Sequence, residues 1–99
     1  MGPEASVLVG REVALHEEDA ALLAQEAGVV RRRAELALAL SKTKQEQAEL
    51  ETDAARANQL RFEADLCRRE SHTLSNYATT LDTEQDRAEA YARVALQKA

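Results

Sequence analysis

The stretch that indicates the fold runs from Ala57 to Ala95 and reads ANQLRFEADLCRRESHTLSNYATTLDTEQDRAEAYARVA. Two rows of mostly small or apolar side chains recur in it every seven residues. Steps of three and four residues alternate between the rows, which is the a/d pattern of a left-handed coiled coil. The a row is Ala57, Ala64, Ser71, Ala78, Gln85 and Ala92, and the d row is Leu60, Cys67, Leu74, Leu81, Ala88 and Ala95. The pattern predicts an all-α chain that forms a coiled coil.

Extended toward the N-terminus, the same seam reaches Leu50, Leu40 and Leu36. The steps from 54 to 57 and from 57 to 60 are both three, which is a stammer that overwinds a supercoil locally. We interpret residues 41–99 as one heptad coiled-coil helix and its seam as the contact between two copies of the chain. The predicted dimer seam consists of Leu36, Leu40, Leu50, Ala57, Leu60, Ala64, Cys67, Ser71, Leu74, Ala78, Leu81, Ala88, Ala92 and Ala95.

The N-terminal half carries three apolar heptad rows instead of one seam. They are Leu8, Leu15, Leu22, Val29 and Leu36; then Val9, Leu23, Val30 and Ala37; then Val13, Ala20, Ala27 and Ala34. A helix with two apolar edges usually contacts two neighbours. Residues 11–40 are therefore expected to form a helix with a broad apolar face, either in a helical hairpin, in a bundle, or against a partner.

Few residues interrupt helix formation. Residues 1–10 are predicted to be an N-terminal cap or frayed turn, and between Arg11 and Lys98 the only glycine is Gly28, with no proline. A glycine weakens a helix by about 1 kcal/mol relative to alanine without ending it. The first expectation is one nearly continuous helix. The alternative is a helical hairpin that turns at residues 41–44, where Thr43 and Glu46 have the spacing of a capping box.

The composition excludes several protein classes. Ala, Leu, Glu, Arg and Lys supply 59 of the 99 residues, while the chain has three glycines, one proline and 3% aromatic residues. Such a composition is typical of a coiled coil or long helix and leaves too few turn and β-branched residues for a sandwich or barrel. No apolar stretch is long enough for a transmembrane helix. The single cysteine suits a reducing compartment, so a cytoplasmic or nuclear location is expected.

Charge is unevenly distributed along the chain. The formal net charge is −5, yet residues 4–26 carry −5 and residues 31–44 carry +4. Arg31, Arg32, Arg33, Lys42 and Lys44 form this basic band and are the partner-binding candidates, because clustered cations attract acidic surfaces such as microtubules or an acidic helix. The same cluster could instead only solubilise the chain or neutralise an acidic neighbouring helix.

No residue pattern points to catalysis, a metal or a cofactor. The segment His16-Glu17-Glu18-Asp19 lacks the second histidine four residues on that a helical zinc site needs. Cys67 and His72 are five residues apart and so lie on different helix faces. An enzyme, a bound small molecule and a membrane are therefore not expected.

The heptads over residues 36–99, together with the Ala, Glu, Leu and Arg usage, resemble a coiled-coil segment of a larger cytoskeletal or chromosome-segregation protein of the kinetochore kind. The resemblance implies a structural module that mediates oligomerisation and spacing. Its first expected partner is a second copy of itself, and the further candidates are other coiled-coil proteins or an acidic polymer such as microtubules. A homodimer is the expected assembly. A monomeric helical-hairpin adaptor is the alternative.

Overall fold

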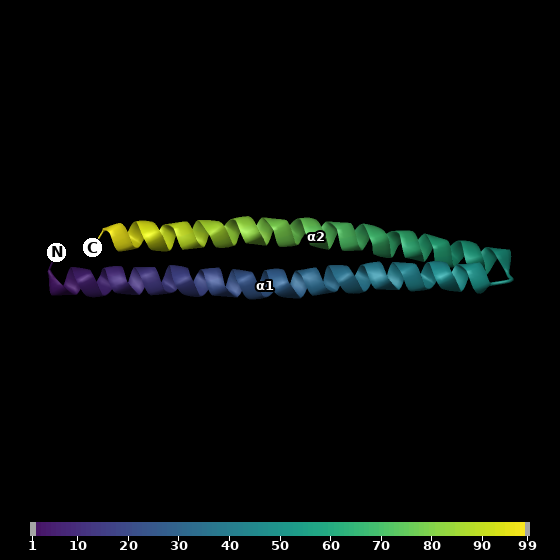
Figure 1. Ribbon diagram of the computed structural model, residues 1–99, viewed down its shortest axis with the longest axis horizontal. Helices are drawn as coiled ribbons and strands as arrows, with labels where there is room; N and C mark the ends of the chain where they lie inside the picture. Colours follow the sequence, from purple (N-terminus) through teal and green to yellow (C-terminus); the bar gives the residue numbers. More distant parts are fainter. Residues whose placement is uncertain (1, 99) are drawn as a thin grey trace. The chain divides into compact units, whose positions relative to one another are not determined.

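A computed structural model describes residues 2–98 as two long helices joined by a three-residue turn. Helix α1 comprises Pro3–Leu50 and helix α2 comprises Ala54–Gln97 (Figure 1). No strand occurs among these residues. The all-α class is confirmed. The expectation of one continuous helix is wrong, because the chain leaves the helix at residues 51–53.

The turn lies ten residues beyond the predicted hairpin position. At residues 41–44 the polar side chains are used in other ways: the Thr43 hydroxyl donates back to the carbonyl oxygen of Ala39 at 3.0 Å, within the same helix. Thr43 therefore does not cap a new helix, and α1 continues to Leu50. The helix also begins at Pro3 and includes most of the segment predicted as a frayed N-terminal turn. A proline fits at this first position because its missing N–H has no helical partner there.

Asp53 starts α2 as its N-cap. One carboxylate oxygen, Oδ1, accepts hydrogen bonds from the backbone N–H groups of Ala55 at 3.0 Å and Arg56 at 3.5 Å. These groups are among the first N–H donors of a helix, which have no intrahelical acceptor. Glu51 closes the turn from the other side: its Oε1 accepts from the backbone N–H of Asp53 at 3.1 Å, and its Oε2 lies 3.1 Å from Nε of Arg56.

The chain divides into two compact units. One unit consists of Val29–Ala78 and contains the turn, and the other consists of Met1–Gly28 with Thr79–Ala99. In the first, the end of α1 and the start of α2 pack side by side in opposite directions (Figure 1). Its core consists of buried small residues with one valine, namely Val30, Ala34, Ala37, Ser41, Ala48, Ala57, Ala64, Ser71 and Ala78.

The unit made of the two terminal segments packs in the same way, with α1 and α2 antiparallel. Its buried residues are Ala20, Ala27, Leu81, Ala88, Ala92 and Ala95. Leu81 is the one large side chain among the described residues that is fully buried. Small side chains allow two helix backbones to approach closely, at the expense of the apolar area that larger side chains would bury.

The predicted seam is divided by the turn. On α2 its members are buried or half-buried, and they face α1 of the same chain. On α1 its members are exposed: Leu36 by 52%, Leu40 by 48% and Leu50 by 85%. The α2 members therefore pack within the chain and the α1 members do not, and contact of the seam with a second copy stays a prediction. The chain reverses at residues 51–53, directly before the stammer at 54–60, and carrying the α2 register back through the turn leads to a different face of α1.

Candidate functional site

Two serines tie the helices together inside the Val29–Ala78 unit. The Ser41 hydroxyl donates to the carbonyl oxygen of Ala64 at 2.7 Å, and the Ser71 hydroxyl donates to the carbonyl oxygen of Ala34 at 2.7 Å. Ser41 follows Ala34 by one heptad, and Ser71 follows Ala64 by one heptad. The two bonds are thus equivalent under exchange of the helices. A serine hydroxyl can reach a facing backbone carbonyl only where two helices lie close together.

The positions of these bonds show which heptad rows of α1 pack against α2. Ser41 belongs to the heptad row of Ala20, Ala27, Ala34 and Ala48, all of which are buried. The neighbouring row contains Val30 and Ala37, which are also buried. These are the second and third apolar rows of the sequence. The periodicity identified them, but only the position of the turn selects them for packing against α2.

The first apolar row of α1 is left exposed. In the terminal unit Leu8, Leu15 and Leu22 are 56–59% exposed, and in the turn-containing unit Val29 and Leu36 are 60% and 52% exposed. The helices therefore cover their small residues and leave larger apolar ones accessible. Exposed apolar side chains are usually scattered singly over a protein surface, whereas these recur at a regular heptad spacing along one helix. This exposed α1 row is the candidate functional site.

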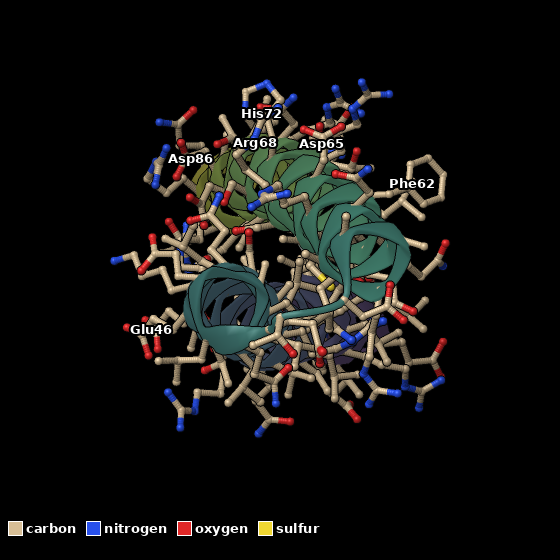
Figure 2. All side chains as sticks on the ribbon, turned by 90° about the vertical axis from the view of Figure 1, so that its right-hand side faces the viewer. Glu46, Phe62, Asp65, Arg68, His72 and Asp86 are labelled. Carbon is tan, nitrogen blue, oxygen red and sulfur yellow. The ribbon has the colours of Figure 1, made fainter. Side chains whose placement is uncertain are left out.

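The outer face of α2 carries fewer apolar side chains. Phe62 is 58% exposed and points away from the neighbouring helix, and Leu66 one turn later is 48% exposed (Figure 2). Charged and polar residues flank this pair, including Asp65, Arg68 and His72, which also point outward (Figure 2). Phe62 is thus a short apolar patch and does not continue as a heptad row.

The basic band is only partly available to a partner. Arg31, Arg32, Arg33 and Lys42 are exposed. Nζ of Lys44, however, lies 3.1 Å from Oε2 of Glu63 and joins α1 to α2. This hydrogen bond, with a second from Gln59, holds the pKa of Glu63 below its ordinary value of 4.5. Arg32 pairs with Glu35 at 3.0 Å on the surface of α1, with both side chains about two-thirds exposed. The three arginines and Lys42 are therefore the accessible part of the band.

Other charged groups pair along the surface of α2. Asp65 accepts a hydrogen bond of 2.6 Å from Arg68 and lies 2.9 Å from Nε of Arg69. The hydrogen bond from Arg68 is the main reason why the pKa of Asp65 lies below 3.8. The i,i+4 pair between Asp65 and Arg69 agrees with the acid-first order that stabilises a helix.

The histidine segment does not gather into a ligand set. His16 lies at the α1–α2 contact of the terminal unit, where its ring is 5.6 Å from that of Tyr91 and its Nε2 is 3.8 Å from Oε1 of Glu12. The same Glu12 oxygen lies 3.6 Å from Nζ of Lys98. Glu17, Glu18 and Asp19 are exposed. Within residues 2–98 no group of three His, Cys, Asp or Glu residues is arranged to hold a metal ion.

Neither described helix has an apolar stretch of the length and hydropathy needed to cross a membrane. Comparison with protein-family models, with curated proteins and with solved structures finds no significant match to this chain.

Proposed function

We propose that the chain is a structural module for oligomerisation and spacing, which joins to a further helix through the exposed α1 row. The supporting observation is the contrast between the two faces of α1. The face toward α2 is built from alanine, serine and valine, whereas the face away from it carries Leu8, Leu15 and Leu22 at heptad spacing, all more than half exposed. A helix that served only its own hairpin would gain by placing the larger side chains inside.

The energetic argument favours a helical partner. Complete burial of a leucine contributes about 1.5–3 kcal/mol, so covering one that is half exposed contributes about 1 kcal/mol. Heptad spacing matches the repeat of a second helix and not that of a flat sheet or a small ligand. The proposed role is therefore a structural one, in which the hairpin holds protein segments together at a defined separation.

Sedimentation of purified protein over a range of concentrations tests the proposal. We expect the native chain to self-associate and Leu22→Lys to weaken this association strongly, because a charge replaces an apolar contact. Phe62→Lys is the matched control, since Phe62 is equally exposed but lies on α2 outside the heptad row. Circular dichroism checks that both variants stay helical. Equal behaviour of Leu22→Lys and Phe62→Lys would contradict the proposal.

A second candidate function uses the exposed Arg31, Arg32 and Arg33 to bind microtubules or another acidic polymer. The three adjacent cations on one helix support it, and the net charge of −5 opposes it. Cosedimentation with microtubules at low and high salt tests it, with Arg31→Glu/Arg32→Glu/Arg33→Glu as the variant. Salt-sensitive binding that this variant abolishes would support the candidate. Absence of binding by the native chain at low salt would exclude it.

A further inference from the structure

We infer that the helical partner is a second copy of this chain, and that residues 15–22 of α1 in one copy pack antiparallel against residues 29–36 of α1 in the other. The inference rests on the proposed function and specifies its partner, direction and register. It uses the helical structure of residues 15–36, which α1 includes without a break.

The apolar residues of the two segments match in spacing. Leu15 and Leu22 are seven residues apart, as are Val29 and Leu36, and all four are exposed. Seven residues correspond to about 10.5 Å along a helix. In the antiparallel arrangement Leu15 of one copy meets Leu36 of the other, and Leu22 meets Val29. Both contacts form at once without any adjustment of register.

The charges between these apolar residues are complementary. Residues 15–22 include Glu17, Glu18 and Asp19 and carry a net charge of −3, with histidine neutral. Residues 29–36 include three arginines and one glutamate and carry +2. The charged pairs are placed alike, because Glu18 and Asp19 follow Leu15 by three and four residues, just as Arg32 and Arg33 follow Val29.

Residues three and four positions apart share a helix face, so these charges border the apolar contacts. The antiparallel pairing therefore sets Glu18 and Asp19 of one copy beside Arg32 and Arg33 of the other. All four side chains are exposed in the single chain. The surface pair between Arg32 and Glu35 is exchanged for one across the interface, at little cost because exposed ion pairs contribute little.

The alternatives are less favourable on the same grounds. A parallel pairing in register would bring Leu15 against Leu15, but it would also set Glu18 and Asp19 against their own copies. A parallel pairing shifted by two heptads also sets acidic residues against basic ones. It leaves segment 29–36 of one copy and segment 15–22 of the other unpaired, so that further copies can add without limit. In the antiparallel pairing, segment 15–22 of each copy meets segment 29–36 of the other. The two contacts are related by a two-fold axis, and the dimer is closed.

Charge exchange tests the pairing in the full chain. The acidic-site variant is Glu18→Arg/Asp19→Arg, and the basic-site variant is Arg32→Glu/Arg33→Glu. Each should raise the dissociation constant of the dimer by about tenfold or more at low salt, because four favourable pairs become repulsive. An equimolar mixture of the two variants should associate about as tightly as the native chain, since acid again meets base at both contacts.

The control variant is Glu46→Arg/Asp86→Arg. It makes the same change of charge as the acidic-site variant, at two exposed side chains outside both segments (Figure 2). It should change the dissociation constant by less than about twofold. High salt should reduce the difference between the variants and the native chain.

Two results would overturn the pairing. In the first, the acidic-site variant associates as tightly as the native chain. In the second, this variant binds the native chain more tightly than either binds itself, which is the behaviour of a parallel dimer in register. The proposed function would survive both results if Leu22→Lys still weakened association and Phe62→Lys did not. It would fail separately if those two variants behaved alike.

Discussion

The Ser71 hydroxyl donates a 2.7 Å hydrogen bond to the carbonyl oxygen of Ala34, which lies 37 residues earlier in the chain. Both residues are buried, and the bond crosses from α2 to α1. Its counterpart from Ser41 to Ala64 crosses in the other direction. These bonds fix the register and direction of the hairpin in the Val29–Ala78 unit, and they require the short side chains that the heptad rows supply there.

Two substitutions of Ser71 should separate the contribution of its hydrogen bond from that of its small size. Ser71→Ala should lower the free energy of unfolding by about 1 kcal/mol, because the Ala34 carbonyl loses a partner beyond those of its own helix. Ser71→Leu should lower it by about 1–3 kcal/mol or more, since the helices must separate to admit the larger side chain. Thermal and urea unfolding measure both changes.

Thr73→Ala serves as the control for these variants, because Thr73 is exposed on α2 two residues away. It should change the free energy of unfolding by less than about 0.5 kcal/mol. A stability of Ser71→Leu equal to that of the native chain would contradict close packing at this position.

Removal of the α2 N-cap should destabilise the turn. Asp53→Ala deletes the acceptor of the Ala55 and Arg56 N–H groups, and a loss of about 1 kcal/mol is expected. Asp53→Asn keeps an oxygen acceptor and should retain most of the stability. Hydrogen exchange should show faster exchange at Ala55 and Arg56 in Asp53→Ala than in Asp53→Asn. Equal exchange in the two variants would argue against capping by this side chain.

The all-α fold and the buried face of α2 could be predicted from the sequence, because a heptad row is a local property of one helix. The face that α1 turns toward α2 could not, since three apolar rows compete there and the turn decides among them. A signal for the turn was present: Asp53 is a favoured N-cap residue before the alanines at 54 and 55, and the heptad is broken at the same place. If the break in the heptad is interpreted as a stammer, the helix continues through residues 51–53. The predicted seam then passes through Leu36, Leu40 and Leu50 on α1.

The serine bonds were missed for a different reason. Ser41 and Ser71 stand in alanine rows, where a small polar residue is compatible with both a buried and an exposed position. Their acceptors, the carbonyl oxygens of Ala64 and Ala34, lie 23 and 37 residues away and carry no sequence signal. The exposed α1 row, by contrast, was present as a heptad. Its exposure follows only once the other two rows are assigned to the hairpin.

Acid should weaken the turn-containing unit through Glu63. The hydrogen bond from Lys44 lowers the pKa of this carboxyl in the folded chain below its ordinary value of 4.5. A carboxyl with a lowered pKa stabilises the fold above its unfolded pKa, and this contribution is lost as the pH falls through the folded pKa. Native protein should therefore lose stability below about pH 4.5.

Glu63→Gln should be less stable than the native chain at pH 7 and should lose less of its stability on acidification. Melting temperatures at several pH values compare the two proteins, and the difference between them should shrink toward acid. Glu46→Gln is the control, because Glu46 is exposed and points into solvent (Figure 2). A difference between Glu63→Gln and native protein that stayed constant with pH would show that the pair with Lys44 contributes nothing through ionisation.

A cysteine pair near the turn should report whether α1 and α2 pack within one chain. The serine bonds join residues whose numbers sum to 105, and the same sum places Ala48 opposite Ala57. Both alanines are buried, by 98% and 96%. Ala48→Cys/Ala57→Cys, with Cys67→Ser to remove the native thiol, should therefore form a disulfide on mild oxidation, because facing positions on closely packed helices bring their Cβ atoms near the roughly 3.5–4.5 Å that the bond requires. On a non-reducing gel the product should run as a monomer at every protein concentration, and thiol titration should show that both introduced cysteines are consumed. A covalent dimer whose yield rose with concentration would instead indicate two extended chains paired along their length, and the hairpin would have to be abandoned.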